Sequence, residues 1–351
     1  MQDKLSVRQL MILFGTAALM PATALLPTME AQLVGSAGWL SLLGAIPILL
    51  CACWAAKSFS QKKLENAPAF IKYILIIMYS AWTFFALVLS LRLSGARLEE
   101  LYGQRMALFC TAGLVIVSIW MGLGKVSALA RAAEVFYLAL TVMLTGVILL
   151  AAIRVEKTNF YIEMAELQSL PLGSFAAAGL ILNVFPAVIL SCKVVWEPYS
   201  RHRIIGWVVA FCVAIALLLG VIIGCLGPRL AARIPSPFLI VVQGVGIKGA
   251  FQRAEALIVT AWTLSDLVLV SLLLHAGRGL AGLVLKKDDR TKICVIPVAL
   301  IAFACAWVFL QDTEMLWSIS SKLMPALGLV LGVLVPVLLK CGQGIRRKGK
   351  M

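Results

Sequence analysis

Two short stretches, Phe14–Thr23 (FGTAALMPAT) and Leu182–Pro186 (LNVFP), decide the fold of this chain. Each places a proline inside a long apolar run. Proline lacks the backbone N–H and its ring clashes with the preceding turn, so each run predicts an interrupted helix. Inside a membrane, irregular backbone persists only where it is buried in protein or lines a cavity. Both stretches are therefore candidate binding sites, with a kinked helix that binds nothing as the alternative.

The composition around these stretches is that of a membrane protein. Of the 351 residues, 62% are hydrophobic and 13% are charged, and the mean hydropathy is +1.00. Soluble domains are about 45–50% apolar and about 25% charged. A single soluble core cannot hide this much apolar surface, and disordered chains are poor in apolar residues. With a soluble domain and a disordered chain excluded, the composition indicates a polytopic membrane protein.

Ten windows are apolar and long enough to cross a membrane, since a spanning helix needs about 20 mostly apolar residues. They are residues 7–28, 37–56, 70–94, 106–123, 132–153, 174–192, 204–226, 250–275, 293–310 and 323–340. The predicted fold class is an all-α polytopic membrane protein of one transmembrane domain, residues 1–351. Its two groups of five helices cover about 7–153 and about 174–340.

The two interrupted helices open the two groups, as helices 1 and 6. An odd number of helices in each group gives the two groups opposite topology. Interrupted helices in corresponding positions of two such halves are the best sequence indication of a transporter-type binding site. The pairing therefore predicts a five-plus-five inverted repeat with its site between helices 1 and 6.

The basic residues set the expected orientation. With the N-terminus in the cytoplasm, most of the 31 Lys and Arg residues lie on the cytoplasmic side, as is usual for membrane proteins. Both termini are then cytoplasmic, and residues 341–351 form a basic tail near anionic lipid. In the outer loop 227–249, Phe238–Gln243 is expected to form a short helix, either a gate or an ordinary interfacial segment.

The candidate ligand site combines both interrupted segments. Amides freed near Gly15 and Thr16 are placed to bind a carboxylate, and Asn183 is a rare polar residue in the middle of a span. An aromatic patch on helix 3 either forms a wall of the pocket or only packs. The candidate ligand-binding residues are Gly15, Thr16, Met20, Pro21, Tyr79, Trp82, Asn183, Phe185 and Pro186.

A second group of residues is expected to serve coupling or gating. Asp266 lies near mid-membrane, where an ionisable group is costly and usually functional. It binds a proton, a cation or a ligand ammonium group, or it pairs with Arg131 or another internal cation. The alternative is a buried carboxylate that only holds helices together. The coupling or gating candidates are Arg131, Glu134, Glu255, Trp262 and Asp266.

Other functional classes find no support in the sequence. The nine cysteines form no CxxC pair, and the two histidines form no HExxH. Both GxGxxG matches lie outside any βαβ unit, which argues against dinucleotide binding. We therefore expect no metal, no cofactor, no enzymatic activity and no nucleic-acid partner.

Several short segments carry a resemblance to a known family. They are Ser6–Leu10 (SVRQL), Gly38–Ser41 (GWLS), Ala130–Glu134 (ARAAE), Pro237-Phe238, and Phe251–Leu257 (FQRAEAL) with Trp262. In order and spacing the chain resembles the spore germination permease family, the B subunits of Ger-type germinant receptors. That family is part of the amino acid/polyamine/organocation superfamily.

The resemblance implies an amino-acid-permease fold and a role in the inner membrane of a bacterial spore. The chain would bind a small nutrient germinant, often an amino acid, and trigger germination and ion release. Its partners would be an A-type membrane subunit and a C-type lipoprotein subunit. Two alternatives remain: a proton- or cation-coupled transporter of an amino acid or polyamine, with Asp266 or Glu255 as coupling group, and a scaffold that binds no ligand.

Overall fold

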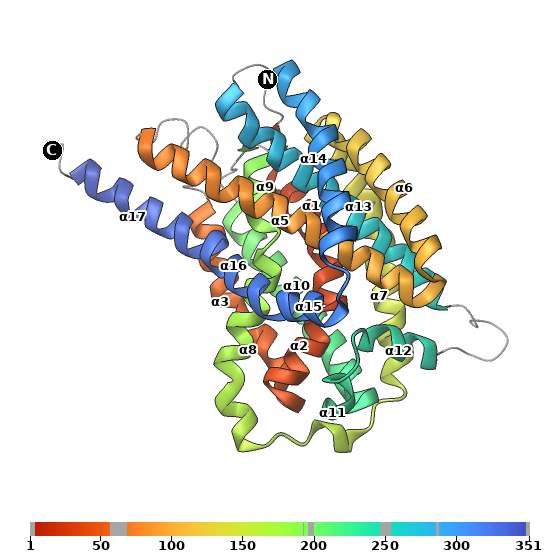
Figure 1. Cartoon of the computed structure of the whole chain (residues 1–351). Helices are drawn as coiled ribbons and strands as arrows, with labels where there is room; N and C mark the ends of the chain where they lie inside the picture. The colour runs from red at the N-terminus through yellow and green to blue at the C-terminus, as the bar shows by residue number, and fades with distance from the viewer. Residues whose placement is uncertain are drawn as a thin grey trace.

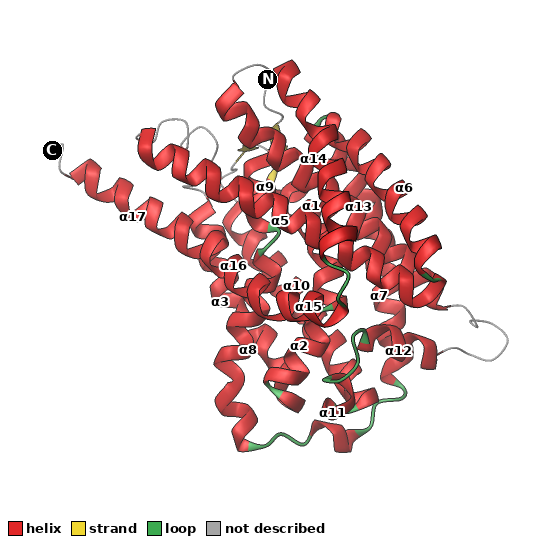
Figure 2. Ribbon diagram, in the orientation of Figure 1, coloured by secondary structure: helices red, strands yellow, loops and turns green. Residues whose placement is uncertain are grey.

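The computed structural model describes residues 4–56, 69–191, 193–195, 200–245, 254–285 and 288–348. Helices account for nearly all of these residues (Figure 2). Ten helical segments of the described chain are long and apolar enough to cross a membrane. The predicted all-α polytopic fold is therefore confirmed, and we number these membrane helices 1 to 10 in chain order.

The first five membrane helices are built from six α-helices. Helix 1 begins as α1 and, after a break at Leu25, is continued by α2; helices 2 to 5 follow as single rods. The elements are β1 (Lys4–Ser6), α1 (Val7–Ala24), α2 (Leu26–Leu33), η1 (Gly35–Ala37), α3 (Gly38–Ala56), α5 (Ala69–Tyr102), α6 (Gln104–Leu123), α7 (Val126–Ala152) and η2 (Lys157–Phe160).

The second five repeat this plan in the opposite direction. Helix 6 is divided into α8 and α9, helices 7 to 9 are α10, α13 and α14, and helix 10 runs from α15 to α17 with two π-helical turns. The elements are α8 (Met164–Leu182), α9 (Phe185–Ser191), β2 (Lys193–Val195), α10 (Ser200–Leu226), α11 (Pro228–Ala231), α12 (Pro237–Val245), α13 (Ala254–Leu285), α14 (Asp288–Phe309), α15 (Thr313–Ser318), η3 (Ile319–Leu323), α16 (Met324–Leu329), η4 (Val330–Leu334) and α17 (Val335–Lys348).

The start of helix 1 and the end of helix 6 meet on one side of the bundle. There β1 pairs in parallel with β2, with Leu5 opposite Val194. Figure 1 shows the N-terminus and the end of α17 in the upper half, and α2, α11 and α12 in the lower half. We call the upper side the terminal face and the lower side the far face.

The beginning of α1 shows what one of the family-like segments does locally. Ser6 Oγ accepts a hydrogen bond from the Gln9 backbone N–H at 3.3 Å, and the Gln9 side chain accepts one from the Ser6 N–H at 3.3 Å. This reciprocal pair is a capping box, which satisfies two backbone donors at a helix start. The SVRQL motif therefore has a structural role at the start of helix 1.

Several helix boundaries differ from the expected ones. Helix 3 was expected over residues 70–94, but α5 continues to Tyr102 and ends before Gly103, at φ +80°. As a result, Arg97 lies inside the helix and not in the loop after it. Helix 10 was expected over residues 323–340, but it begins at Thr313 with α15 and contains the two π-helical turns η3 and η4; such turns frequently occur at functional sites.

Burial separates a central group of helices from a lipid-facing group. α1 and α8 lie inside the bundle, and most of their small and apolar residues are buried. By contrast α6, α7 and α14 expose many large apolar side chains, among them Phe109, Trp120, Leu138 and Phe309. Such a surface is stable only against lipid or another protein. The chain is a multi-pass membrane protein.

Helix 6 and helix 10 approach each other closely enough for their backbones to touch. A Cβ added at Gly179 would lie 2.1 Å from the Pro325 carbonyl oxygen, and one added at Gly328 would lie 1.9 Å from the Gly179 carbonyl oxygen. Only glycine permits this contact, as is common for small residues between membrane helices. The contact holds α16 beside the break in helix 6.

Candidate functional site

The break in helix 6 is organised around Asn183. The residues between α8 and α9 are Asn183 and Val184, and the Asn183 side chain is buried. Its amide Nδ2 donates to the Met324 carbonyl oxygen on helix 10 at 2.6 Å, and its Oδ1 accepts from Trp82 Nε1 on helix 3 at 3.4 Å. The polar side chain predicted from the sequence thus links three helices at the break.

Helix 1 departs from regular α-helical geometry at two places. α1 passes through Pro21 and ends at Ala24, and the chain turns at Leu25 before α2 begins. Deeper in α1, the Ser265 hydroxyl of helix 8 accepts from the Met20 N–H at 3.0 Å and donates to the Thr16 carbonyl at 2.6 Å. In a regular helix that N–H and that carbonyl would bond to each other. A side chain of helix 8 therefore stands inside the hydrogen-bond ladder of helix 1.

A small cavity lies where the two breaks meet. Its volume is about 30 Å³, room for about two water molecules. Sites for drug-sized ligands begin at about 300 Å³. Its walls include Met20, Pro21, Leu25, Asn183, Val184 and Met324.

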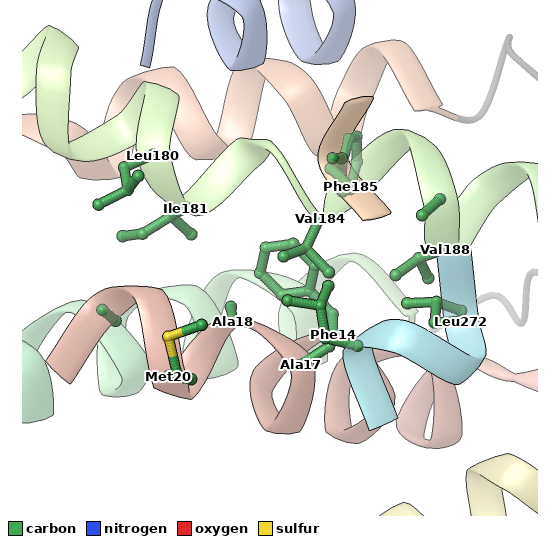
Figure 3. Close-up of a cluster of buried hydrophobic side chains, with 14 of the residues drawn as sticks. Phe14, Ala17, Ala18, Met20, Leu180, Ile181, Val184, Phe185, Val188 and Leu272 are labelled. Carbon is green, nitrogen blue, oxygen red and sulfur yellow. The ribbon is translucent and has the colours of Figure 1, made fainter. Parts of the chain in front are cut away.

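Apolar side chains fill the rest of the space between helices 1 and 6. Phe14, Ala17, Val184, Phe185, Val188 and Leu272 belong to one cluster of buried apolar side chains, and Figure 3 shows them between the ribbons of helices 1, 6 and 8. The Phe14 and Phe185 rings meet edge to face at 5.9 Å between centroids. A ligand of amino-acid size needs this cluster to separate, so the structure is a closed conformation.

A buried ion pair lies beside the cavity. Arg97 of α5 forms a hydrogen-bonded pair with Asp266 of α13, and their side chains are 8% and 1% exposed. Arg97 Nη1 also contacts the Met20 sulfur at 3.2 Å, and its guanidinium lies 5.5 Å from the centre of the Trp262 ring. Asp266 therefore pairs with Arg97 and not with Arg131, and the pair connects helices 1, 3 and 8.

Trp262, next to the Arg97 guanidinium, also contacts the end of α1 and the short helix α12. Its Nε1 donates to the Thr23 hydroxyl near the end of α1 at 2.8 Å. Its ring lies 6.1 Å from that of Phe238, which is on the short helix α12. That helix was expected from the sequence over Phe238–Gln243, and its Phe238 is buried. Arg97, Asp266, Trp262, Thr23 and Phe238 form what we call the far-face network.

Several predicted ligand residues point away from the cavity. A Cβ at Gly15 would lie 2.7 Å from Trp207 and 3.2 Å from Tyr137, so Gly15 packs against helices 7 and 5. Tyr79 donates its hydroxyl to the Leu331 carbonyl of η4 at 2.9 Å. Thr16 Oγ1 donates to the Ile12 carbonyl at 2.9 Å.

The remaining ligand candidates lie at the breaks. Met20, Pro21 and Asn183 line the cavity. Trp82 bonds to Asn183, and Pro186 is buried in the first turn of α9, next to Phe185. These residues are brought together as the sequence predicted, although the apolar cluster covers most of them.

Three coupling candidates lie elsewhere or outside the described side chains. Arg131 is exposed, and its Nε donates to the Ser127 carbonyl at 3.3 Å. Of the coupling candidates whose side chains are described, only Asp266 forms an ion pair, with Arg97. Arg131 and Glu134 therefore do not pair with each other. Glu255 is in the first turn of α13, and its side chain lies outside the described part.

Sequence reasoning missed three participants. Arg97 was assigned to a loop, because hydropathy falls before helix 3 ends. Ser265 and the Met324 carbonyl carry no sequence signal of their own, since serines and carbonyls are present in every membrane helix. The absence of proline between Leu93 and Gly103 was the one available indication for Arg97.

Solved structures similar to this chain share its fold. One is a crystal structure of MhsT in complex with L-phenylalanine, with a TM-score of 0.67 and 15% identity over 95% of this chain and 89% of that chain. Another is the substrate-bound outward-open state of a Na⁺-coupled sialic acid symporter, with a TM-score of 0.59 and 11% identity over 92% of this chain and 86% of that chain. No protein-family model and no curated protein matches the sequence.

The similarity extends over nearly the full length of both chains, so it covers both groups of five helices. The chain therefore has a transporter-type fold with the five-plus-five inverted repeat that the sequence predicted. At these identities the likeness concerns the fold alone.

Proposed function

We propose that this chain binds a small solute between the breaks of helices 1 and 6 and carries it across the membrane. The observation that carries the proposal is the cavity of about 30 Å³ at which Pro21 and Leu25 meet Asn183 and Val184. Helix breaks that face each other at membrane depth are where transporters of this architecture hold their solutes.

A small carboxylate-bearing solute, such as an amino acid, fits the proposal best. Of the two similar structures, one holds L-phenylalanine and the other is a sialic acid symporter, and both of these compounds carry a carboxylate. In this chain the polar groups at the cavity are the side chains of Asn183 and Ser90 and the backbone around the two breaks. The other walls are apolar, which suits an uncharged side chain on the solute.

The contacts that close the cavity toward the far face support an alternating-access mechanism. The Arg97–Asp266 pair and the Trp262–Thr23 hydrogen bond join helices 1, 3 and 8 beside the cavity. Breaking these contacts while the cluster of Phe14 and its neighbours separates would admit a solute from that side. The solute must bind the opened arrangement more tightly than the closed one, since equal affinity shifts no population.

The basic residues support an orientation with the terminal face in the cytoplasm. Lys125, Arg131, Arg278 and Lys340 belong to the described basic residues that the sequence assigned to that side. The far face, with α11 and α12, would then be the outer side, from which the solute enters.

The test is uptake by the purified chain in liposomes, using radiolabelled amino acids and imposed proton or sodium gradients. Asn183→Ala is expected to reduce uptake at least tenfold. The matched control is Asn159→Ala, because Asn159 Nδ2 likewise donates to a carbonyl, that of Gly224 at 2.9 Å, but on η2 outside the cavity. Equal uptake by both variants would place the solute elsewhere.

A germinant-receptor B subunit is the second candidate. It is favoured by the family-like segments of the sequence and by the exposed apolar surface of α7, which is free to contact lipid or an A-type or C-type partner subunit. Here the solute would be a nutrient germinant in the inner spore membrane. Solute binding without uptake by the chain alone, together with co-purification of both partners, would favour this candidate over transport.

A further inference from the structure

Glu30 on α2 is a buried acid to which the sequence analysis assigned no role. Its side chain is 0% exposed. Neither carboxyl oxygen has a hydrogen-bond partner among the described residues. A buried carboxylate without a partner is strongly disfavoured, so such a group is expected to carry a proton. The far-face network does not use it.

The Glu30 carboxyl lies in a small space between α3 and α8. A Cβ built at Gly173 of α8 would be 2.6 Å from Glu30 Oε2, 2.6 Å from Ser41 Oγ and 2.4 Å from Val34. The missing side chain at Gly173 is therefore what leaves room for the carboxyl. The Glu30 carboxyl and the Ser41 hydroxyl both lie beside the position that a side chain at Gly173 would occupy.

The other ionisable groups near this end of the bundle do not neutralise Glu30. On α8, the Glu166 carboxylate accepts hydrogen bonds from the Ser36 N–H and hydroxyl. On α10, Cys225 donates to the Ala151 carbonyl, and on α11 Arg229 is exposed. The other ionisable residues on elements packed against α2 are Arg8 on α1, Cys51 and Cys53 on α3, and Arg201, His202, Arg203 and Cys212 on α10. None of the described cations lies within 4.0 Å of the Glu30 carboxyl, the limit for an ion pair.

Glu30 lies where the segment after the helix 1 break packs against α3 and α8. α2 follows the break at Leu25, and α8 precedes the break in helix 6. Both breaks line the central cavity. Any opening of the cavity toward the far face has to change how α2 packs against α3 and α8.

We propose that Glu30 is a proton-binding site of this chain and that its protonation holds α2 closed against α3 and α8. The step is a simple acid–base exchange in which the carboxyl O–H bond breaks and the proton passes to solvent. The ionised carboxylate then needs water, so α2 separates from Gly173 and Ser41. The inference deepens the proposed function by naming the proton as the coupling ion, and to that extent it rests on it.

The direction of the pH dependence follows from burial. In the closed state the Glu30 carboxyl is buried and has no hydrogen-bond partner among the described residues, which favours its neutral form. In the open state water can solvate the ionised carboxylate. The closed state therefore binds more protons than the open state from the ordinary pKa of a glutamate upward. Closure is favoured at low pH and is lost as pH rises through this range.

The experiment is hydrogen exchange of the α2 amides in the full chain in lipid nanodiscs, from pH 5 to pH 9, after correction for the intrinsic exchange rate. One titrating group with an ordinary pKa in the open state increases opening about tenfold per pH unit below its closed-state pKa, and less above it. Glu30→Gln, which is neutral at every pH, is expected to remove this dependence. Glu100→Gln, at an exposed position on α5, is expected to retain it.

Two outcomes overturn the proposal: a wild-type chain whose α2 protection is independent of pH, or a Glu30→Gln variant with the wild-type profile. If Glu30→Gln does not fold, Glu30→Met provides the same test with a neutral side chain of similar length. Because exchange needs no solute, a normal pH profile without any uptake would refute transport and leave the proton site standing. Uptake that is insensitive to a proton gradient in both wild type and Glu30→Gln would overturn the coupling role.

Discussion

Replacing Asp266 by Asn tests whether the Arg97–Asp266 pair holds the closed conformation. The variant keeps the shape of the side chain but removes its charge. Arg97 is then left 8% exposed, with the Met20 sulfur and the Trp262 ring as its remaining neighbours. Removing one partner of a buried pair typically costs about 3–5 kcal/mol, because the other charge stays buried without compensation.

The expected cost converts into a melting shift that can be measured. An unfolding entropy of about 2.1 cal/mol/K per residue gives about 740 cal/mol/K for 351 residues. A loss of 1 kcal/mol then lowers the melting temperature by about 1.4 °C, so Asp266→Asn is expected to lower it by about 4–7 °C. Scanning fluorimetry of the purified chain in detergent measures this shift.

The double variant Arg97→Met/Asp266→Asn is the decisive comparison. It removes both charges, so it is expected to be closer to wild type than Asp266→Asn alone. Glu99→Gln is the matched control, because Glu99 pairs with Arg92 but is 23% exposed, and a pair reached by solvent contributes about 1 kcal/mol or less. If the double variant instead has a lower melting temperature than Asp266→Asn, removing Arg97 adds to the loss of stability. That result would refute the idea that each charge compensates the other.

Two further predictions concern the helix contacts that shape the cavity. Ser265→Ala removes a donor and an acceptor from the interrupted ladder of α1, so the melting temperature should fall by about 1–4 °C, from about 1–3 kcal/mol; an unchanged melting temperature would contradict the role given to this hydroxyl. Gly328→Ala places a methyl group 1.9 Å from the Gly179 carbonyl oxygen, so little folded protein should elute as a single species in size-exclusion chromatography. Gly220→Ala, whose nearest neighbours are at 3.9 Å, should elute like wild type, and a normal profile for both variants would refute the close contact.

Several residues of the candidate site could be predicted from the sequence, but the contacts that these residues make could not. Pro21 and Asn183 stood out because a proline or an amide is unusual in the middle of an apolar run, and both line the cavity. Gly15 was chosen because a small residue near Pro21 could free backbone amides for a carboxylate, yet it packs against Trp207 and Tyr137. A local sequence shows that a small residue permits close approach, but it does not show from which side the neighbour comes.

The sequence could not predict which side chains from distant segments pair with each other. Asp266 was recognised as a costly charge, but its partner Arg97, 169 residues away, was assigned to a loop. Glu30 drew no notice, because a single acid near the end of a span is common. It becomes unusual only when Gly173 and Ser41 enclose it.

The sequence by itself determined the membrane class, the ten spans and the position of the interruption in helix 6, because these depend on the length of apolar runs and on proline, which act over a few residues. For helix 1 it indicated an interruption but not its place, since α1 passes through Pro21 and ends at Ala24. The tertiary structure alone decided that the cavity is closed in this conformation, that Arg97 compensates Asp266 and that Glu30 has no hydrogen-bond partner among the described residues. Those properties depend on how closely helices approach across the bundle. That approach is set by contacts such as Gly179 against Gly328, which join parts of the chain that hydropathy cannot relate.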